Sequence, residues 1–300
     1  MKLPAELPSL IEEWKTAETV AFALLGSYAR GDAGPHSDVD VVRFVNDDKH
    51  GEDARSFLAG DGEAAKERDD CVRSPGSPRP WLVVRSTVTP SQVEGWFTEP
   101  GQAVNIIIGL RDGRALWDPN GIFSAIQQRA WEFKWTQALQ DKADLVAGKE
   151  LVGWIEEAHK GLEGLRRSDD GRLLNARYGL SWGLAWVMRL HRGVLSTSDN
   201  TFLDDVICAV GPETRWARLL RGAFGKATGG REEPSSLHEN VEAGLLLYCE
   251  TFSLLSEALP RDDFLLIEAT VQRIRSELKC VAQASSESPD GQDYSHERCV

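Results

Sequence analysis

Hydrophobic and polar positions change their period near residue 120, and this change predicts two halves of different structure. Before it, short apolar runs at 19–25, 38–44 and 81–87 are bounded by glycine, proline and polar residues, which is typical of buried strands. After it, apolar residues recur three or four positions apart in segments that end at glycine or proline, as in amphipathic helices. The pattern predicts an α+β fold: a small mixed sheet with flanking helices, followed by an all-α helical bundle.

Domain boundaries follow from the same change of period. We predict an N-terminal domain over 1–120 and a helical domain over 121–281, both of ordinary domain size. The remaining residues, 282–300, are polar and rich in serine and charge, which predicts a disordered tail.

The connections between the predicted strands carry weaker signals. We predict surface helical pieces at 54–58 and 64–68 and a loop at 73–80, which contains three prolines. The apolar, isoleucine-rich run 103–110 and the run 115–117 flank a polar turn, and this arrangement predicts a β-hairpin.

One helix start is specified in detail. Thr89 can accept a hydrogen bond as an N-cap, Pro90 suits the first helical position, and Gln92 stands at the third. We therefore predict a helix that begins after Thr89.

Composition narrows the range of partners. The chain has 300 residues, a net charge of −13, 41% hydrophobic residues and 27% charged residues, as soluble globular proteins have. Surplus negative charge argues against nucleic acid, whose binding depends on lysine and arginine at the phosphates. No stretch approaches about 18 uninterrupted apolar residues, and the N-terminus lacks the apolar core of a secretory signal. We predict a cytoplasmic protein whose five scattered cysteines are free thiols.

The segment 26–40 carries the clearest chemistry and reads GSYARGDAGPHSDVD. A Gly-Ser turn directly after a buried strand allows backbone N–H groups and a hydroxyl to approach a phosphate. Asp38 and Asp40 stand at i and i+2 of the next predicted strand, so both carboxylates lie on one face. Paired hard oxygen ligands suit Mg²⁺. By itself the Asp-x-Asp pair is a weak signal, because on an exposed strand such a pair is more often simply solvated.

The combination of apolar strand, Gly-Ser, short turn and Ser-Asp-x-Asp resembles the DNA polymerase β-type nucleotidyltransferase superfamily. A helical second half makes the chain similar to the antibiotic-modifying branch of that superfamily, the aminoglycoside and lincosamide nucleotidyltransferases. The motif itself covers about 25 residues.

This resemblance implies specific roles for the residues of the motif. Asp38 and Asp40 are the implied catalytic residues and would hold one or two Mg²⁺ ions. Nucleotide binding would fall to Gly26, Ser27, Arg30 and Ser37, with Arg30 neutralising phosphate charge. Other interpretations stay open: Ser27 could only cap the turn, Arg30 could pair with Asp32 or Asp38, and the two aspartates could hold no metal.

The chain departs from the family pattern in one respect. A later strand of the family usually supplies a third carboxylate, yet the run 81–87 reads WLVVRST and contains no acid. Arg85 or Ser86 stands where the acid is expected. The remaining candidates for a third acid or base are Glu94, Asp69, Asp70 and, in the helical half, Glu156 or Glu157.

The resemblance implies an Mg²⁺-dependent transferase that moves a nucleoside monophosphate, AMP from ATP, to a hydroxyl of a small molecule. An aminoglycoside-type antibiotic is compatible with the acidic composition, which would make the protein a resistance enzyme. Two alternatives stay open: a catalytically impaired nucleotide-binding homologue, suggested by the missing acid, and an antitoxin-like enzyme that attaches AMP to proteins. The sequence leaves open the acceptor, the base preference and the oligomeric state.

Overall fold

A computed structural model describes residues 3–49, 54–58, 81–226 and 235–286. Its contacts divide the chain into two compact units: residues 1–143 together with 192–206, and residues 144–191 together with 207–300. The predicted boundary after residue 120 stays a prediction. By contacts alone, the first unit extends further and takes in a segment from the helical half.

The first unit is built on a five-stranded sheet with the strand order β3-β4-β2-β1-β5. Strands β2 and β4 are parallel, and the other neighbours are antiparallel, so the sheet is mixed as predicted. Its strands are β1 Thr19–Leu25, β2 Val39–Val45, β3 Ala54–Leu58, β4 Trp81–Val88 and β5 Arg114–Trp117. Three of the predicted strands are thereby confirmed to within one residue.

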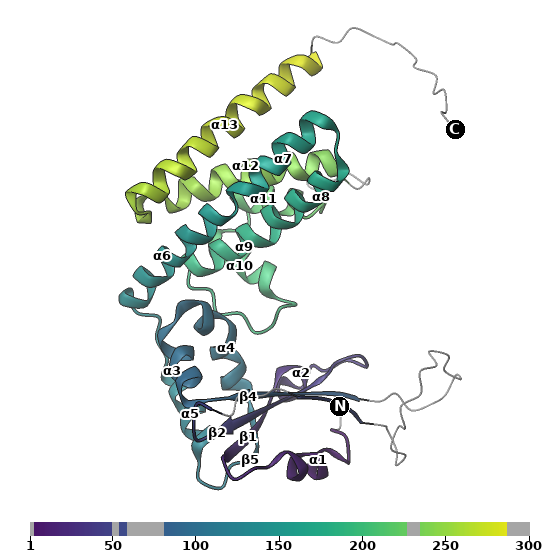
Figure 1. The fold of residues 1–300 in the computed structure, drawn as a ribbon, viewed down its shortest axis with the longest axis vertical. Helices are drawn as coiled ribbons and strands as arrows, with labels where there is room; N and C mark the ends of the chain where they lie inside the picture. Colours follow the sequence, from purple (N-terminus) through teal and green to yellow (C-terminus); the bar gives the residue numbers. More distant parts are fainter. Residues whose placement is uncertain (1–2, 50–53, 59–80, 227–234, 287–300) are drawn as a thin grey trace, which may run out of the picture. The chain divides into compact units, whose positions relative to one another are not determined.

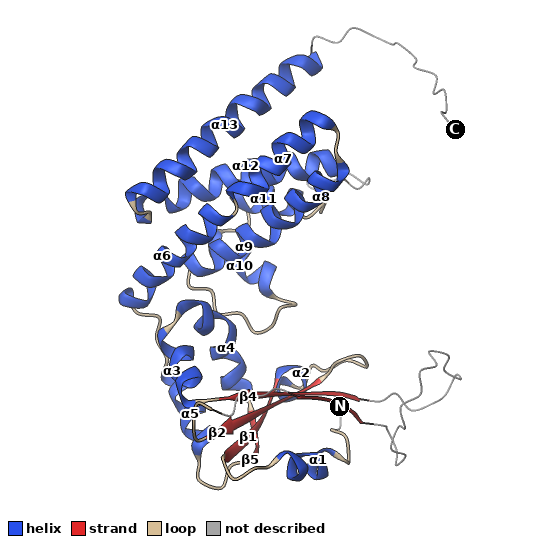
Figure 2. Ribbon diagram, viewed as in Figure 1, coloured by secondary structure: helices blue, strands red, loops and turns tan. Residues whose placement is uncertain are grey.

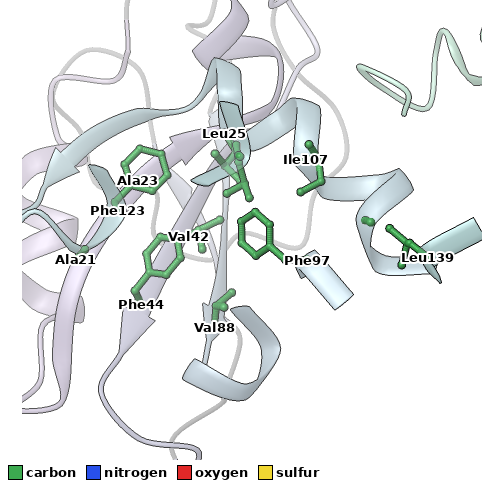
Figure 3. Packing of buried hydrophobic residues seen from close by; sticks show 13 residues of the cluster. Ala21, Ala23, Leu25, Val42, Phe44, Val88, Phe97, Ile107, Phe123 and Leu139 are labelled. Atoms are coloured by element: carbon green, nitrogen blue, oxygen red, sulfur yellow. The ribbon is translucent and has the colours of Figure 1, made fainter. Parts of the chain in front are cut away.

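Helices cover both faces of this sheet (Figures 1 and 2). On one face lie α3 Pro90–Thr98, α4 Pro100–Asp112 and α5 Ile122–Glu132. Figure 3 shows the core that they form with the strands, in which Leu25, Val42, Phe44, Ile107 and Phe123 pack together. The other face is covered by α1 Leu7–Trp14. The predicted α+β class is confirmed.

Alternation along β2 decides which face each side chain takes. Val42 and Phe44 belong to the core beneath α4, whereas Val39 and Val41 belong to the core beneath α1. Asp40 has the same parity as Val42, so it lies on the α4 face. This is the face on which the site is built.

Two predictions about this unit are wrong. Residues 54–58 form the edge strand β3, paired antiparallel with β4, and not a helix, because the free edge of β4 supplies backbone partners that local propensity does not reveal.

Residues 103–110 lie in α4, and 115–117 pair with β1 as β5, so there is no hairpin there. The run of isoleucines is typical of a strand, but Pro100 begins a helix here. The residues that this helix buries recur at helical spacing: Ala103, Val104, Ile107 and Leu110. The pieces predicted at 64–68 and 73–80 lie outside the described residues.

Helices make up the rest of the described chain, as predicted. They are α6 Gln137–Gly153, α7 Ile155–Arg167, α8 Asp170–Tyr178, the π-helical turn η1 Gly179–Gly183, α9 Leu184–His191, α10 Phe202–Val210, α11 Arg215–Ala223, α12 Leu237–Leu255, the 3₁₀ turn η2 Ser256–Ala258 and α13 Arg261–Ser286. The predicted tail beyond Ser286 lies outside the described residues. No described helix combines the length and the apolar character needed to cross a membrane.

Within the second unit, α12 packs against α7, α8, α9, α11 and α13. Two buried polar groups fix its position. The Tyr248 hydroxyl donates to the Leu151 carbonyl at 3.1 Å, and the Trp216 indole donates to the Thr251 hydroxyl at 2.9 Å. Buried polar groups of this kind are costly unless paired, so they specify one arrangement of the bundle. Of the predicted free thiols, Cys208 and Cys249 are free in the described part of the chain.

The capping box predicted at the start of α3 is present. The Gln92 backbone N–H donates to the Thr89 hydroxyl at 3.4 Å, and the Thr89 N–H donates to the Gln92 side chain at 2.9 Å. Thr89→Val keeps the shape but removes the acceptor, so we expect it to lower the free energy of unfolding by about 1 kcal/mol. Urea unfolding measures the loss. Thr89→Ser, which keeps the hydroxyl, is the control, and an equal loss in both variants would contradict the capping role.

Candidate active site

The site begins where β1 ends. Gly26 follows the extended Leu25 and adopts φ +66°, a left-handed conformation that favours glycine. A Cβ atom at this position would lie 2.0 Å from Oδ2 of Asp40. Two separate constraints therefore require glycine at position 26: the backbone turn and the carboxylate that lies against it.

The short helix α2, Gly26–Arg30, then leads into the loop that returns to β2. The Trp81 indole donates to the Tyr28 hydroxyl at 2.9 Å, which fixes α2 to β4. Gly31, at φ +90°, ends the helix and donates to the Ser27 carbonyl at 2.9 Å. The Ser37 hydroxyl accepts from the Gly34 N–H at 2.9 Å and shapes the turn just before Asp38. Local hydrogen bonds thus bring both ends of the motif together.

A cavity of about 680 Å³ opens at this point, entirely within the first unit. All six motif residues to which the sequence analysis gives a role line it: Gly26, Ser27, Arg30, Ser37, Asp38 and Asp40. Its lining also includes His36, three residues of α4 and the residues 197–200, none of which had been given a firm role. No local sequence signal indicates the last group, because more than a hundred residues separate it from the motif.

Arg30 joins the motif to this distant segment. Its Nη1 donates to the Thr197 carbonyl at 3.2 Å, while its Nε pairs with Asp32 Oδ2 at 3.2 Å. The Ser196 N–H donates to the Val104 carbonyl of α4 at 3.4 Å. The pairing of Arg30 with Asp32 is one of the structural interpretations left open by the sequence, and it coexists with a place in the cavity.

The two aspartates of the motif repel one another electrostatically. Burial and, to a smaller extent, the charge of Asp38 raise the pKa of Asp40, Arg30 lowers it, and together they leave this pKa at about 6. Two neighbouring carboxylates, of which Asp40 is partly removed from water and lies against Gly26, favour a bound cation that would relieve the repulsion. Hard oxygen donors suit a divalent ion such as Mg²⁺, so the residues present fit the metal that the resemblance implies.

Strand β4 supplies no third carboxylate to this face. Register places Val84 beside Asp40 and Ser86 beside Val42. Arg85 lies on the opposite face, with its guanidinium carbon 5.2 Å from the centre of the Trp14 ring. Within the described ranges no group of three or more histidine, cysteine, aspartate or glutamate side chains is arranged to hold a metal.

Those acids considered from the sequence that the structure describes lie elsewhere. Glu94, on α3, makes a bidentate pair with Arg129 at 2.6 and 2.9 Å, and this hydrogen-bonded pairing lowers its pKa. It does not line the cavity. Glu156 belongs to α7 of the second unit and pairs with Lys160 at 2.8 Å. Asp69 and Asp70 lie outside the described residues.

A second cavity, of about 430 Å³, adjoins the first, since Asn105 and Ile106 line both. It opens over Ser86, the strand position nearest to where an acid was expected, and one wall is Trp96. No charged side chain is among its lining residues. Together the two cavities offer space for two small molecules side by side.

Comparison with known proteins agrees with this geometry. Residues 7–89 match the family model described as a nucleotidyltransferase domain. The N-terminal part of the chain therefore contains a nucleotidyltransferase domain, and the predicted enzyme class, a nucleotidyltransferase, is confirmed. The match ends before α3, so it concerns the N-terminal part of the chain. Members of this family generally use a nucleoside triphosphate and a divalent metal.

No curated protein matches the chain. Among solved structures, one similar chain is a nucleotidyltransferase-like protein from Exiguobacterium sibiricum 255-15, at 12% identity and a TM-score of 0.47, covering 93% of this chain and 89% of that chain. The antibiotic-type branch suggested by the sequence stays a prediction.

Gly26 and Gly31 form a matched pair for testing the site, because both have positive φ but only Gly26 touches Asp40. An added Cβ at Gly31 would meet nothing within 4 Å. We expect Gly31→Ala to cost about 1–2 kcal/mol through backbone strain alone, and Gly26→Ala to cost more because its Cβ also meets the Asp40 carboxylate. Only Gly26→Ala should abolish Mg²⁺-dependent stabilisation, measured as the metal-induced rise in melting temperature. Equal loss of that rise in both variants would contradict the contact with Asp40.

The raised pKa of Asp40 predicts a pH dependence of stability without metal. The folded-state pKa of about 6 exceeds the ordinary aspartate pKa of 3.8, so stability from this carboxyl is present below pH 3.8 and is lost as pH rises through 6. We expect Asp40→Asn to melt above the wild type at neutral pH in EDTA, with the difference shrinking in acid. Asp141→Asn, at an exposed position on α6, is the control. A variant that melts below the wild type at neutral pH would show that the charged form is not destabilised.

Proposed function

We propose that this protein is an Mg²⁺-dependent nucleotidyltransferase that transfers AMP from ATP to a hydroxyl of a small molecule in the cytoplasm. The observation that carries the proposal is the convergence of Gly26, Arg30, Asp38 and Asp40 on one cavity in a nucleotidyltransferase domain. Each of these residues has the chemistry that a nucleoside triphosphate and its metal require.

Binding of the triphosphate would use the turn after β1. Gly26 and Ser27 both line the cavity, so a backbone N–H and a hydroxyl of this turn can approach a phosphate. Arg30 adds a positive charge and Ser37 a further hydroxyl. These groups would orient the triphosphate so that its α-phosphorus faces the acceptor, which is most of what phosphoryl-transfer catalysis needs.

Asp38 and Asp40 would hold the metal. When bound, Mg²⁺ supplies positive charge that stabilises the leaving pyrophosphate and the attacking oxygen. The pKa of Asp40 is raised toward neutrality in the absence of a cation, and binding of a cation would lower it. The Asp40 carboxyl would therefore lose its proton as the metal binds, so metal affinity should rise with pH.

The adjoining cavity over Ser86 supports a small acceptor. A volume of about 430 Å³ suits a ring-sized molecule and is far smaller than a protein surface would need. We retain an aminoglycoside-type antibiotic as the first acceptor to test. The net charge of −13 and the carboxylates of the first cavity favour a polycation, and a role in antibiotic resistance would follow.

Incubation with α-labelled ATP, Mg²⁺ and a panel of aminoglycosides and lincosamides tests the proposal. We expect label to appear on at least one acceptor together with an equal amount of pyrophosphate. Asp38→Asn and Asp40→Asn should each lower turnover by about 10²-fold or more, which is the effect of removing one electrostatic stabiliser.

Omission of Mg²⁺ and replacement of ATP by GTP, CTP or UTP are the controls for cofactor and base. Product formed equally well by the two aspartate variants would rule out the proposed metal site. If the wild type labels no member of the panel and releases no pyrophosphate, the proposed acceptor class is wrong.

A further inference from the structure

A third carboxylate does line the cavity, although it does not come from the sheet. Among the described residues that line it, the acids are Asp38, Asp40 and Asp199. Asp199 belongs to the segment 192–206, which is part of the first unit although it follows α9 in the chain. Because the segment belongs to the same compact unit as the motif, the position of Asp199 at the cavity is a property of that unit.

The backbone around Asp199 is held on both sides. Before it, Leu195 packs against the core beneath α4, the buried Ser196 donates to Val104, and Arg30 donates to the Thr197 carbonyl. After it, the N–H of Thr201 donates to the Ser198 carbonyl at 3.2 Å and closes a tight turn. Asp199 and Asn200 occupy the two central positions of this turn, and both line the cavity. This turn therefore places Asp199, an exposed acidic residue, at the wall of the cavity.

Metal binding is already provided for without Asp199. The described residues contain no cluster of three acidic or histidine ligands, so Asp199 is not placed as a third ligand beside Asp38 and Asp40. The reaction still needs a group that takes the proton from the acceptor hydroxyl. Strand β4 offers Val84 and Ser86 on this face, and neither is a base.

We propose that Asp199 is the general base of the transfer reaction, an assignment that rests on the function proposed above. An acceptor in the second cavity would extend its hydroxyl past Asn105 and Ile106, which line both cavities, into the first cavity, which Asp199 lines. The acceptor O–H proton passes to the Asp199 carboxylate as the acceptor oxygen forms a bond to the α-phosphorus of ATP. The bond from that phosphorus to the bridging oxygen breaks, and pyrophosphate leaves with the electron pair. The proton then leaves Asp199 to solvent, so the carboxylate is ready for the next turnover.

Other titratable groups face the same cavity and define the alternatives. His36 lies in the loop before Ser37, and Arg30, Asp38 and Asp40 complete the charged lining. Asp38 and Asp40 would be engaged by the metal, and Arg30 is an acid only at extreme pH. His36 is the rival base, so the test includes it.

The test compares Asp199→Asn with Asp199→Glu, His36→Asn and the exposed acid variant Asp204→Asn, which lies on α10 outside the cavity lining. We expect Asp199→Asn to lower kcat about 100-fold, as loss of a general base does, and to remove the acidic limb of the kcat profile. Asp199→Glu should recover part of the activity, and Asp204→Asn should match the wild type. Calorimetry with Mg²⁺ and α,β-methylene-ATP should give the same affinity for Asp199→Asn as for the wild type.

Several results would overturn the assignment. They are an unchanged kcat for Asp199→Asn, a change confined to the KM of the acceptor, loss of the Mg²⁺-nucleotide affinity in that variant, or removal of the acidic limb by His36→Asn instead. If the wild type transfers nucleotide while Asp199→Asn is fully active, the assignment alone falls. If the wild type transfers none, the assignment falls together with the proposed function.

Discussion

The site depends on the close approach of the Gly26 backbone to the carboxylate of Asp40. This contact is possible because residue 26 has no Cβ and adopts a left-handed conformation at the end of a buried strand. It places the turn that would hold phosphates directly beside the residue that would hold the metal. This arrangement has an electrostatic cost, because the Asp40 carboxylate is partly removed from water and lies near the carboxylate of Asp38. The raised pKa of Asp40 reflects that cost. Two carboxylates that repel one another thus lie beside the turn, at a point where a bound cation would compensate for their charge.

How far the sequence predicts the structure depends on whether the decisive contacts are local. The strand–turn–strand around 26–40 is formed by consecutive residues, so its strands and its turn can be predicted from the sequence. The capping box at Thr89 is equally local and can be predicted too. The edge strand β3 and the helix α4 are not, because the partner backbone of β4 and the core beneath α4 override the local propensity of 54–58 and 103–110. The place of the segment 197–200 at the cavity cannot be predicted from the sequence either. Nothing in its own residues indicates a cavity whose other walls are formed by 25–40 and α4.

The structure shows what the residues of β4 near the site do in place of an acid. Arg85 faces the Trp14 ring on the far side of the sheet, and Val84 packs beside Asp40. An acid at position 84 would place a third carboxylate next to an aspartate whose pKa is already raised by burial and by Asp38. In the absence of metal, that arrangement would raise the electrostatic cost further. A carboxylate on an exposed turn, as at Asp199, avoids this cost because it stays solvated until substrate enters.

Arg30 interacts with the turn after β1, with the segment that carries Asp199 and with Asp40. Its guanidinium pairs with Asp32, donates to the Thr197 carbonyl and lowers the pKa of Asp40 through its charge. A planar fork with several donors can serve a carboxylate and a carbonyl in different directions at once, whereas the ammonium of a lysine is a compact point charge. The side chain is only 16% exposed, so it is held in one place. Arg30 therefore connects the loop that carries Asp199 to the same turn that brings Gly26 against Asp40. As a result, one side chain influences both the shape of the cavity and the balance of charge within it.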